Sequence, residues 1–134
     1  SLLINCSSIN ELYQVFNVGA SEYWETHYNL DKESSKKKKK LSKSFIDLLV
    51  INTIIPLRFA YALSQKKEIT QELIDLAVSI PSEKNTIIDK FNGIGLVSSN
   101  SYQSQALLQL KKEYCNTNKC LSCAIGQKLI NFTT

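Results

Sequence analysis

The chain has 134 residues and a mass of 15.1 kDa. Hydrophobic residues make up 43% and charged residues 21%, which is typical of a globular domain and unlike disordered, collagen-like or disulfide-dense proteins. The net charge is +4, but six lysines lie between Lys36 and Lys43, and the remainder has ten Lys and Arg against twelve Asp and Glu. The protein is therefore a slightly acidic body with one basic segment. No uninterrupted apolar run reaches about 18 residues, so we expect no membrane span.

Two short helices are predicted at the start of the chain. Ser8 and Glu11 have the spacing of a capping box, in which each side chain satisfies a free backbone N–H, and this predicts a helix over 9–17. A second helix is predicted over 21–28. Tyr23, Trp24 and His27 share one face of it because residues four apart in a helix lie one above the other.

A polar break over 29–44 contains a lysine-rich loop at 31–43. Like charges repel and cannot be buried together, so the sequence favours a solvated, mobile loop. The alternative is an electrostatic contact with phosphates or an acidic partner. No aromatic residue interleaves the lysines, so stacking on bases is not indicated, and Arg58 is the one arginine. The candidate contacts are Lys36, Lys37, Lys38, Lys39, Lys40 and Lys43.

The most apolar segment, 44–64, is predicted to be a central buried helix, because about 20 residues is too long for a strand. Pro56 has no N–H to donate and clashes one turn back, so we expect a kink near Asn52. An apolar stripe is expected to face the core, widened by Ile46, Val50, Ile54 and Tyr61. It comprises Phe45, Leu48, Leu49, Asn52, Ile55, Pro56 and Phe59.

Further helices are predicted over 70–79, 82–92, from 100 to near 115, and over 121–132. Gly93 is expected to be a left-handed C-terminal cap, and no convincing strand pattern is seen. The sequence thus predicts an all-α fold, a compact single-domain bundle of about six helices around the Pro-kinked apolar helix, with residues 1–134 as one domain.

Three cysteines stand in a C-x4-C-x2-C pattern at Cys115, Cys120 and Cys123. Three thiolates so close could hold zinc or an iron–sulfur cluster, with Cys6 or His27 as a possible fourth ligand. The cysteines could instead be small buried side chains, a disulfide or a redox pair, and the spacing does not choose among these.

No catalytic constellation is recognisable. The chain has no phosphate-binding loop, nucleophile elbow or zinc-protease helix motif. His27 is favoured as a packed histidine over a general base, and Glu22 and Glu25 as the wet face of a helix over paired carboxylates. Whether the chain is an enzyme therefore stays open.

Four stretches are similar to the C-terminal region of an uncharacterised bacterial family of domains of unknown function. The resemblance implies that the chain is the C-terminal part of a longer protein, which agrees with the absence of Met. It implies no activity, and the family's upstream half only faintly resembles restriction-endonuclease-type nucleases. The family's Tyr-Cys…Cys…Cys motif falls on Tyr114 and the three cysteines. The stretches are SEYWETHY (21–28), INTIIPLRFAYA (51–62), PSEKNTII (81–88) and SQALLQLKKEYCNTNKCLSCAIG (104–126).

Two functions are consistent with these features. The first is a non-enzymatic helical accessory or protein-interaction domain with a structural cysteine cluster, whose partner is the N-terminal part of its own parent protein. The second is an accessory domain of a nucleic-acid-processing enzyme, with lysines on phosphates and zinc or an iron–sulfur cluster on the cysteines. A reducing, cytoplasmic location is expected from the lysine-rich composition and unpaired cysteines.

Overall fold

The structure is a computed structural model that describes residues 3, 6 and 8–131. It is mostly helical with one small two-stranded sheet, which confirms the predicted all-α class. The chain divides into two compact units, residues 1–76 and 77–134, and each is described by itself. Helix α6 (Thr70–Ser79) contains the boundary between them.

The first unit begins with α2 (Ile9–Val15), which the capping box predicted. The Ser8 hydroxyl accepts the Glu11 N–H at 3.3 Å and donates to the Glu11 carboxylate at 3.1 Å. Leu12 from α2 is fully buried. The Tyr13 hydroxyl donates to Asp47 of the next long helix at 2.6 Å, and this hydrogen bond links α2 to that helix.

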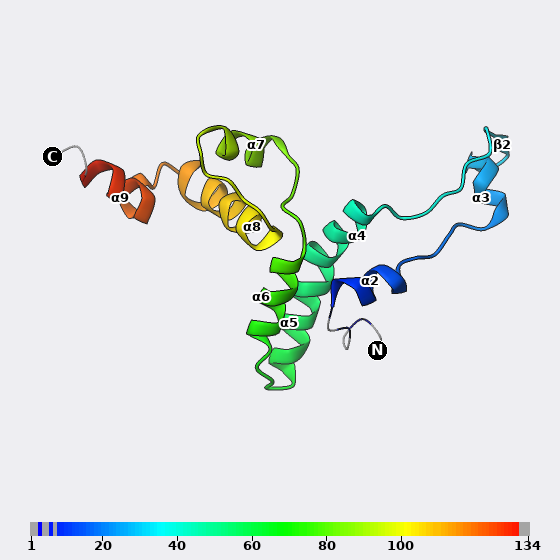
Figure 1. Cartoon of the computed structure of the whole chain (residues 1–134), viewed down its shortest axis with the longest axis horizontal. Coiled ribbons are helices and arrows are strands. Elements are labelled where there is room, and N and C mark those ends of the chain that lie inside the picture. The colour runs from blue at the N-terminus through cyan, green and yellow to red at the C-terminus, as the bar shows by residue number, and fades with distance from the viewer. Residues whose placement is uncertain (1–2, 4–5, 7, 132–134) are drawn as a thin grey trace. The chain divides into compact units, whose positions relative to one another are not determined.

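The predicted second helix is shorter than expected. Helix α3 (Glu22–Thr26) gives way to β1 (His27–Asn29), which pairs antiparallel with β2 (Lys32–Glu33). Asp31 takes a left-handed φ of 60° in the turn between them, a conformation that Asp tolerates better than most residues. The expectation of no strand is therefore wrong at this hairpin, which joins α2 and α4 through two extended connections (Figure 1).

The long apolar helix is present as α4 (Lys43–Leu49), a π turn (Val50–Ile54) and α5 (Ile55–Ser64). Pro56 cannot donate to the Asn52 carbonyl four residues back. The helical hydrogen-bond pattern changes here to a π turn, in which the Ile55 N–H donates to the Val50 carbonyl five residues back. The Asn52 side-chain amide donates to the Leu48 carbonyl at 2.9 Å. The predicted distortion at Pro56 is thus a π turn inside a continuous helix.

Only one side of the long helix is buried, so the predicted central burial is wrong. The inward residues recur every four positions, at Ile46, Val50, Ile54, Arg58 and Ala62. The predicted core stripe faces out instead: Phe45, Leu48, Asn52, Pro56 and Phe59 are all exposed.

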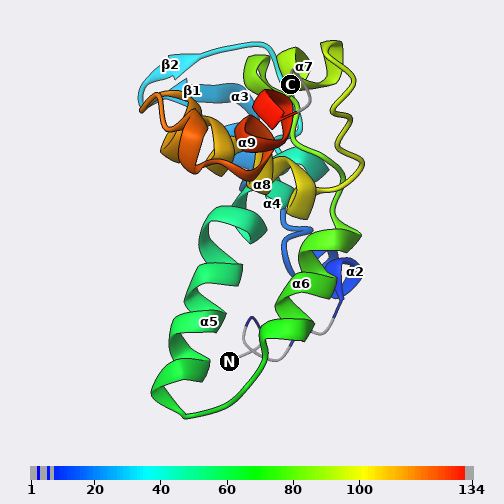
Figure 2. The same cartoon turned by 90° about the vertical axis from the view of Figure 1, so that its left-hand side faces the viewer.

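Helices α5 and α6 form an antiparallel helical hairpin, seen in Figures 1 and 2. Arg58 is 6% exposed, donates to the Cys6 carbonyl at 2.7 Å and lies 3.8 Å from the Glu72 carboxylate. Leu73 and Leu76 of α6 are buried. Arg58 therefore links α5, α6 and the segment before α2, at a position where a hydrophobic residue would be expected.

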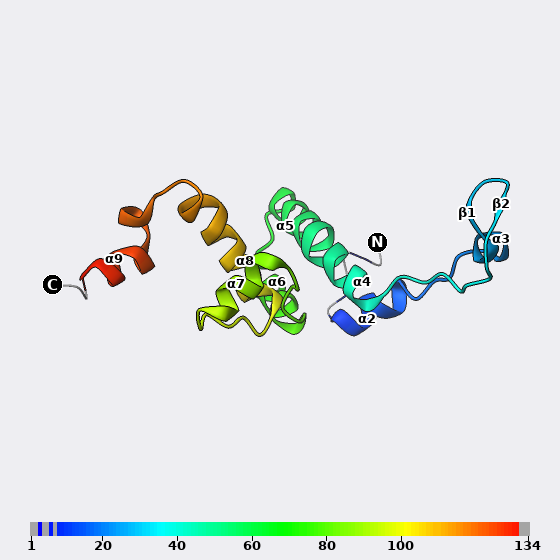
Figure 3. The same cartoon turned by 90° about the horizontal axis from the view of Figure 1, so that it is seen from above.

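The second unit contains α7 (Thr86–Gly93) and α8 (Ser101–Leu110), capped by Asn85 and Asn100. The predicted helix over 82–92 therefore starts later. A second π turn (Lys111–Cys115), a 3₁₀ turn (Cys120–Ser122) and α9 (Ala124–Asn131) follow, as Figure 3 traces. Gly95, not Gly93, has the left-handed φ, at 88°. Phe132, the predicted last helical residue, lies outside the described residues.

Hydroxyl groups hold the start of the second unit together. Ser101 and Ser104 are fully buried. The Ser101 hydroxyl donates to the Ala77 carbonyl at 2.6 Å, and its N–H donates to the Ile80 carbonyl at 2.8 Å. The Ser104 hydroxyl accepts the Glu83 N–H at 3.3 Å. Small polar side chains thus satisfy backbone groups that would otherwise be buried without partners.

Candidate functional site

The lysine-rich segment belongs to a closed loop, residues 19–40, which we call the arm. Its base is closed by an antiparallel bridge between Gly19 and Lys40, where the Ala20 N–H donates to the Lys39 carbonyl at 2.9 Å. Further from this base, the Lys37 N–H donates to the Glu25 carbonyl at 2.8 Å. Ser34 donates to the Thr26 carbonyl through both its N–H and its hydroxyl. The loop therefore has backbone hydrogen bonds both at its base and between its two sides.

The arm contains a cluster of ring side chains. Tyr23 stacks on His27 with ring centroids 4.1 Å apart, and Trp24 meets the Tyr23 ring edge-on at 5.1 Å. The His27 Nδ1 donates to the Tyr23 carbonyl at 2.9 Å. Tyr28 follows with 62% of its surface exposed, and Trp24 is 39% exposed. Tyr23 thus contacts both other rings, although His27 lies in β1 and not on the predicted helix.

The hairpin brings the lysines to these rings. The Lys39 ammonium lies 3.5 Å from the centroid of the Tyr28 ring and donates to the His27 carbonyl. A cation over an aromatic face is attracted by the partial negative charge of the π electrons on that face. The sequence interpretation, that no aromatic residue interleaves the lysines, is true along the chain but wrong in space. The Asn29–Asp31 turn was the signal that could have revealed the pairing.

The other lysines fall into two groups. Lys36 lies 3.6 Å from the Glu25 carboxylate, and Lys40 donates to the Asn17 side chain at 3.4 Å. Lys43, at the start of α4, lies 5.1 Å from the Tyr13 ring. Lys37 and Lys38 are exposed, and in the part of the chain that the structure describes their ammonium groups have no partner.

The long helix carries a second surface, which we call the exposed stripe. Its spacing is three or four residues throughout, and the π turn adds the one residue that keeps its two halves in line. Asn52 is its one polar side chain, and it has no charge. Phe59 is 45% exposed and Leu63 is 61% exposed. The members are Phe45, Leu48, Asn52, Pro56, Phe59 and Leu63.

The same helix, Lys43–Ser64, meets the length and composition of a membrane span, with a mean hydropathy of 1.6 over its most apolar window. The sequence analysis expected no such segment. One helix of this kind is weak evidence for a membrane, because core helices pass the same test. Asp47 and Arg58 on its inward side are held by partners from the same unit, Tyr13 and the Cys6 carbonyl.

The four cysteines differ in burial and in the unit to which they belong. Cys115 and Cys120 are exposed, whereas Cys123 and Cys6 are buried. Among residues 3, 6 and 8–131, no three His, Cys, Asp or Glu side chains are grouped so that they could hold a metal ion. Cys6 and His27, the candidate fourth ligands, belong to the first unit, whereas the three clustered cysteines belong to the second.

Backbone contacts, rather than the thiols, shape this segment. The Lys119 N–H donates to the Tyr114 carbonyl at 2.9 Å, and the Gln127 side chain donates to the Leu121 carbonyl at 2.7 Å. Gly126 lies so close to the Cys120 backbone that an added Cβ would be 2.2 Å from its carbonyl oxygen. This segment is therefore a tight turn in which Gly126 packs against the Cys120 backbone.

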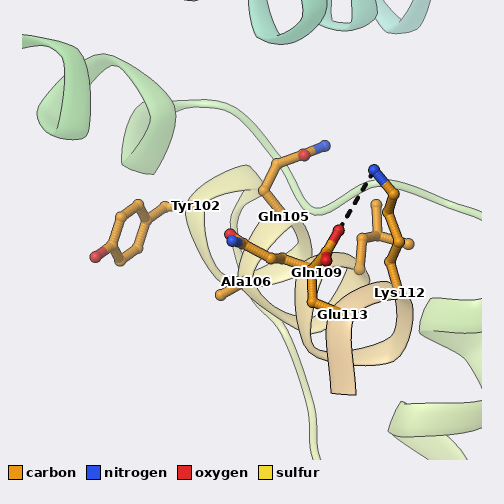
Figure 4. A pocket seen from close by; sticks show the side chains of 7 residues that line it. Tyr102, Gln105, Ala106, Gln109, Lys112 and Glu113 are labelled. Atoms are coloured by element: carbon orange, nitrogen blue, oxygen red, sulfur yellow. Dashed lines mark ion pairs between the residues drawn. The ribbon is translucent and has the colours of Figure 1, made fainter. Parts of the chain in front are cut away.

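A hollow of about 520 Å³ lies on the second unit. Figure 4 shows that its lining side chains come from α8 and the π turn that follows it, with Lys112 and Glu113 paired at 3.5 Å. The hollow is open to solvent on its other sides. Its lining residues include no set of groups able to do acid–base or nucleophilic chemistry. The arm and the exposed stripe are thus the two surfaces with a distinctive arrangement.

Comparison with known proteins decides the family. The model of a family described as "Protein of unknown function (DUF2851)" matches residues 1–86, well over half of the chain. The chain belongs to this family. The DUF2851 region contains the whole arm and the whole exposed stripe, and it ends at the start of α7. No curated protein and no solved structure matches the chain.

Proposed function

We propose that this chain is a non-catalytic helical interaction domain that docks through the exposed stripe of its long helix. The observation that carries the proposal is the stripe itself. It extends over about 27 Å of helix at 1.5 Å per residue, it has no charged member, and it lies on a helix whose opposite side is already buried. Apolar patches of this extent are typical of binding surfaces.

The occupant we propose is an apolar helix. Side chains spaced three and four residues apart form a ridge that fits the groove of another helix. The Asn52 side-chain amide donates to the Leu48 carbonyl, so its side-chain oxygen can accept a hydrogen bond from the partner helix. A single polar group inside an apolar seam fixes the register of two packed helices.

We propose that this partner helix belongs to the N-terminal part of a longer parent protein. A docked segment of the same polypeptide has a high effective concentration and needs little affinity per unit area. The uncharged stripe offers no electrostatic steering, which a diffusing partner would exploit to associate quickly. An intramolecular partner therefore suits this surface best.

Photo-crosslinking tests the proposal in the parent protein. Phe59 is replaced by p-benzoylphenylalanine, and the protein is irradiated in the producing cells and analysed by peptide mass spectrometry. The expected product has the mass of one protein molecule and joins the Phe59 peptide to a peptide upstream of this chain. Gln65, exposed just after α5, is the matched control position and should give little of this product.

Three results would contradict the proposal. A product of twice the mass would assign the stripe to a second copy of the protein. A lipid adduct would assign it to a membrane surface. Equal yields of the upstream product at Phe59 and Gln65 would remove the stripe as the docking surface.

A further inference from the structure

The arm carries two kinds of exposed group. The rings of Trp24, Tyr23 and His27 contact one another, and the Lys39 ammonium lies over the Tyr28 ring and donates to the His27 backbone carbonyl. Lys37 and Lys38 stand two and one positions before Lys39, exposed and without a partner among the described residues. The arm thus carries partly exposed aromatic rings together with two lysines whose ammonium groups have no partner among the described residues.

The arm is held in this arrangement before any ligand arrives. The bridge at Gly19 and Lys40, the Lys37–Glu25 backbone hydrogen bond and the β1–β2 pairing restrain it at three levels. Ordering a loop on binding costs conformational entropy. A loop that is already ordered does not lose affinity in this way.

We propose that the arm binds single-stranded nucleic acid. The ammonium groups of Lys37 and Lys38 contact backbone phosphates, and the exposed rings of Trp24 and Tyr28 each stack on a base. A positive track beside aromatic platforms is the general chemistry of single-strand binding, since every base has a flat face and every nucleotide a phosphate. The proposal is independent of the docking function of the exposed stripe.

The structure favours a single strand over other polyanions. Reading a duplex groove usually depends on arginine, and Arg58 is buried against the Cys6 carbonyl. Helix α3 has five residues, too few to fill a major groove. An acidic peptide or an anionic membrane would use the lysines but would leave the Trp24 and Tyr28 rings without flat partners. Unstacked bases use both.

The affinity is expected to be modest and strongly dependent on salt. From residue 19 to residue 43 the chain has seven lysines against four acidic residues, so the local field is positive but partly compensated. Each phosphate neutralised by a lysine contributes about −0.7 to the slope of log K against log salt for a single strand. Two contacts from Lys37 and Lys38 therefore predict a slope of about −1.4.

Trp24 provides the test, because it is the one tryptophan in the chain. Unlabelled oligodeoxythymidine is titrated into the purified chain at low salt and Trp24 emission is followed. Stacking of a base on the indole is expected to quench the emission. Heparin of equal charge, a duplex of equal length and phosphatidylserine vesicles serve as comparison ligands and are expected to quench little.

Two sets of variants separate the charges from the rings. Lys37→Gln with Lys38→Gln should flatten the salt slope by about 1.4, whereas Lys66→Gln with Lys67→Gln, an exposed pair outside the arm, should leave it unchanged. Tyr28→Ala should weaken binding about tenfold, and Tyr28→Phe, which keeps the ring beneath Lys39, should bind like the original protein.

Four outcomes would overturn the proposal. They are the absence of quenching at low salt, equal quenching by heparin or by vesicles, equal affinity for the duplex, and an unchanged salt slope in the Lys37 and Lys38 variant. The lysine variant replaces two exposed side chains by shorter uncharged ones, so it keeps the test informative if Tyr28→Ala disturbs the arm.

Discussion

At the scale of single residues, Tyr13 shows how one polar contact couples two helices. Its hydroxyl donates to the Asp47 carboxylate at 2.6 Å. Burial, the hydrogen bond and the negative charge of Asp47, in that order, raise the pKa of Tyr13 to about 12. Because the folded pKa lies above the unfolded value, the contribution of Tyr13 to stability is complete below about pH 10 and is lost as the pH rises towards 12.

Replacing Tyr13 by Phe should therefore change how stability depends on pH. Tyr13→Phe is expected to lower the free energy of unfolding at neutral pH by about 1 kcal/mol, the typical value of one hydrogen bond. The difference between the two proteins should shrink above about pH 10. Urea unfolding on both sides of that pH measures it, with Tyr102→Phe at a half-exposed position as the control. A difference that does not vary with pH would show that the Asp47 contact is not what Tyr13 contributes.

At the scale of elements, the turn before α9 requires a glycine, without a side chain, at position 126. An added Cβ at Gly126 would meet the carbonyl oxygen, carbonyl carbon and Cα of Cys120 within 3.1 Å. Backbone atoms cannot move aside as a flexible side chain can. Gly126→Ala is therefore expected to destabilise the packing of the 3₁₀ turn on α9 by about 1–3 kcal/mol, seen as faster amide hydrogen exchange over residues 120–131.

Gly93 is the matched control for this prediction. It ends α7 and has open space where a Cβ would be added. Gly93→Ala should leave exchange in residues 120–131 unchanged and should stabilise its own unit by about 0.5 kcal/mol, because alanine restricts the unfolded chain. Equal protection of residues 120–131 in both alanine variants would contradict the close approach at Gly126.

The long helix shows what an apolar pattern can and cannot predict. Its existence and its distortion at Pro56 follow from local chemistry, namely helix length and a missing N–H donor. Which side faces the core does not follow, because apolar residues cover both sides. The side of Ile46 and Ala62 is buried and the side of Phe45 and Phe59 is exposed, a choice made by contacts with α2 and α6.

The arm shows the same limit in another form. Single residues with turn chemistry, such as Asp31, were visible in the sequence. The pairing of His27 with Glu33, which carries Tyr28 to Lys39, is a contact between segments. Lysine repulsion predicted a mobile loop, and the backbone hydrogen bonds at Lys37 and Lys39 were not visible in the charge pattern.

At the scale of the whole molecule, the all-α class was predictable because helical periodicity and caps recur along the chain. The division at residue 76 was not, since it falls inside α6 with no Gly, Pro or polar linker to signal it. The cysteine pattern shows that the three cysteines are close along the chain, but it does not show which of them are buried. Exposure of Cys115 and Cys120 beside burial of Cys123 depends on the turn that follows the second π turn.

The central claim is that the exposed stripe is a covered interface in the parent protein. Hydroxyl-radical footprinting of this chain and of the parent protein, read at Phe45 and Phe59 with Tyr102 as an exposed reference, tests it directly. The account predicts rapid oxidation of both phenylalanines in the isolated chain and at least fivefold slower oxidation in the parent, with Tyr102 unchanged. Equal oxidation of Phe45 and Phe59 in the two proteins would contradict the claim.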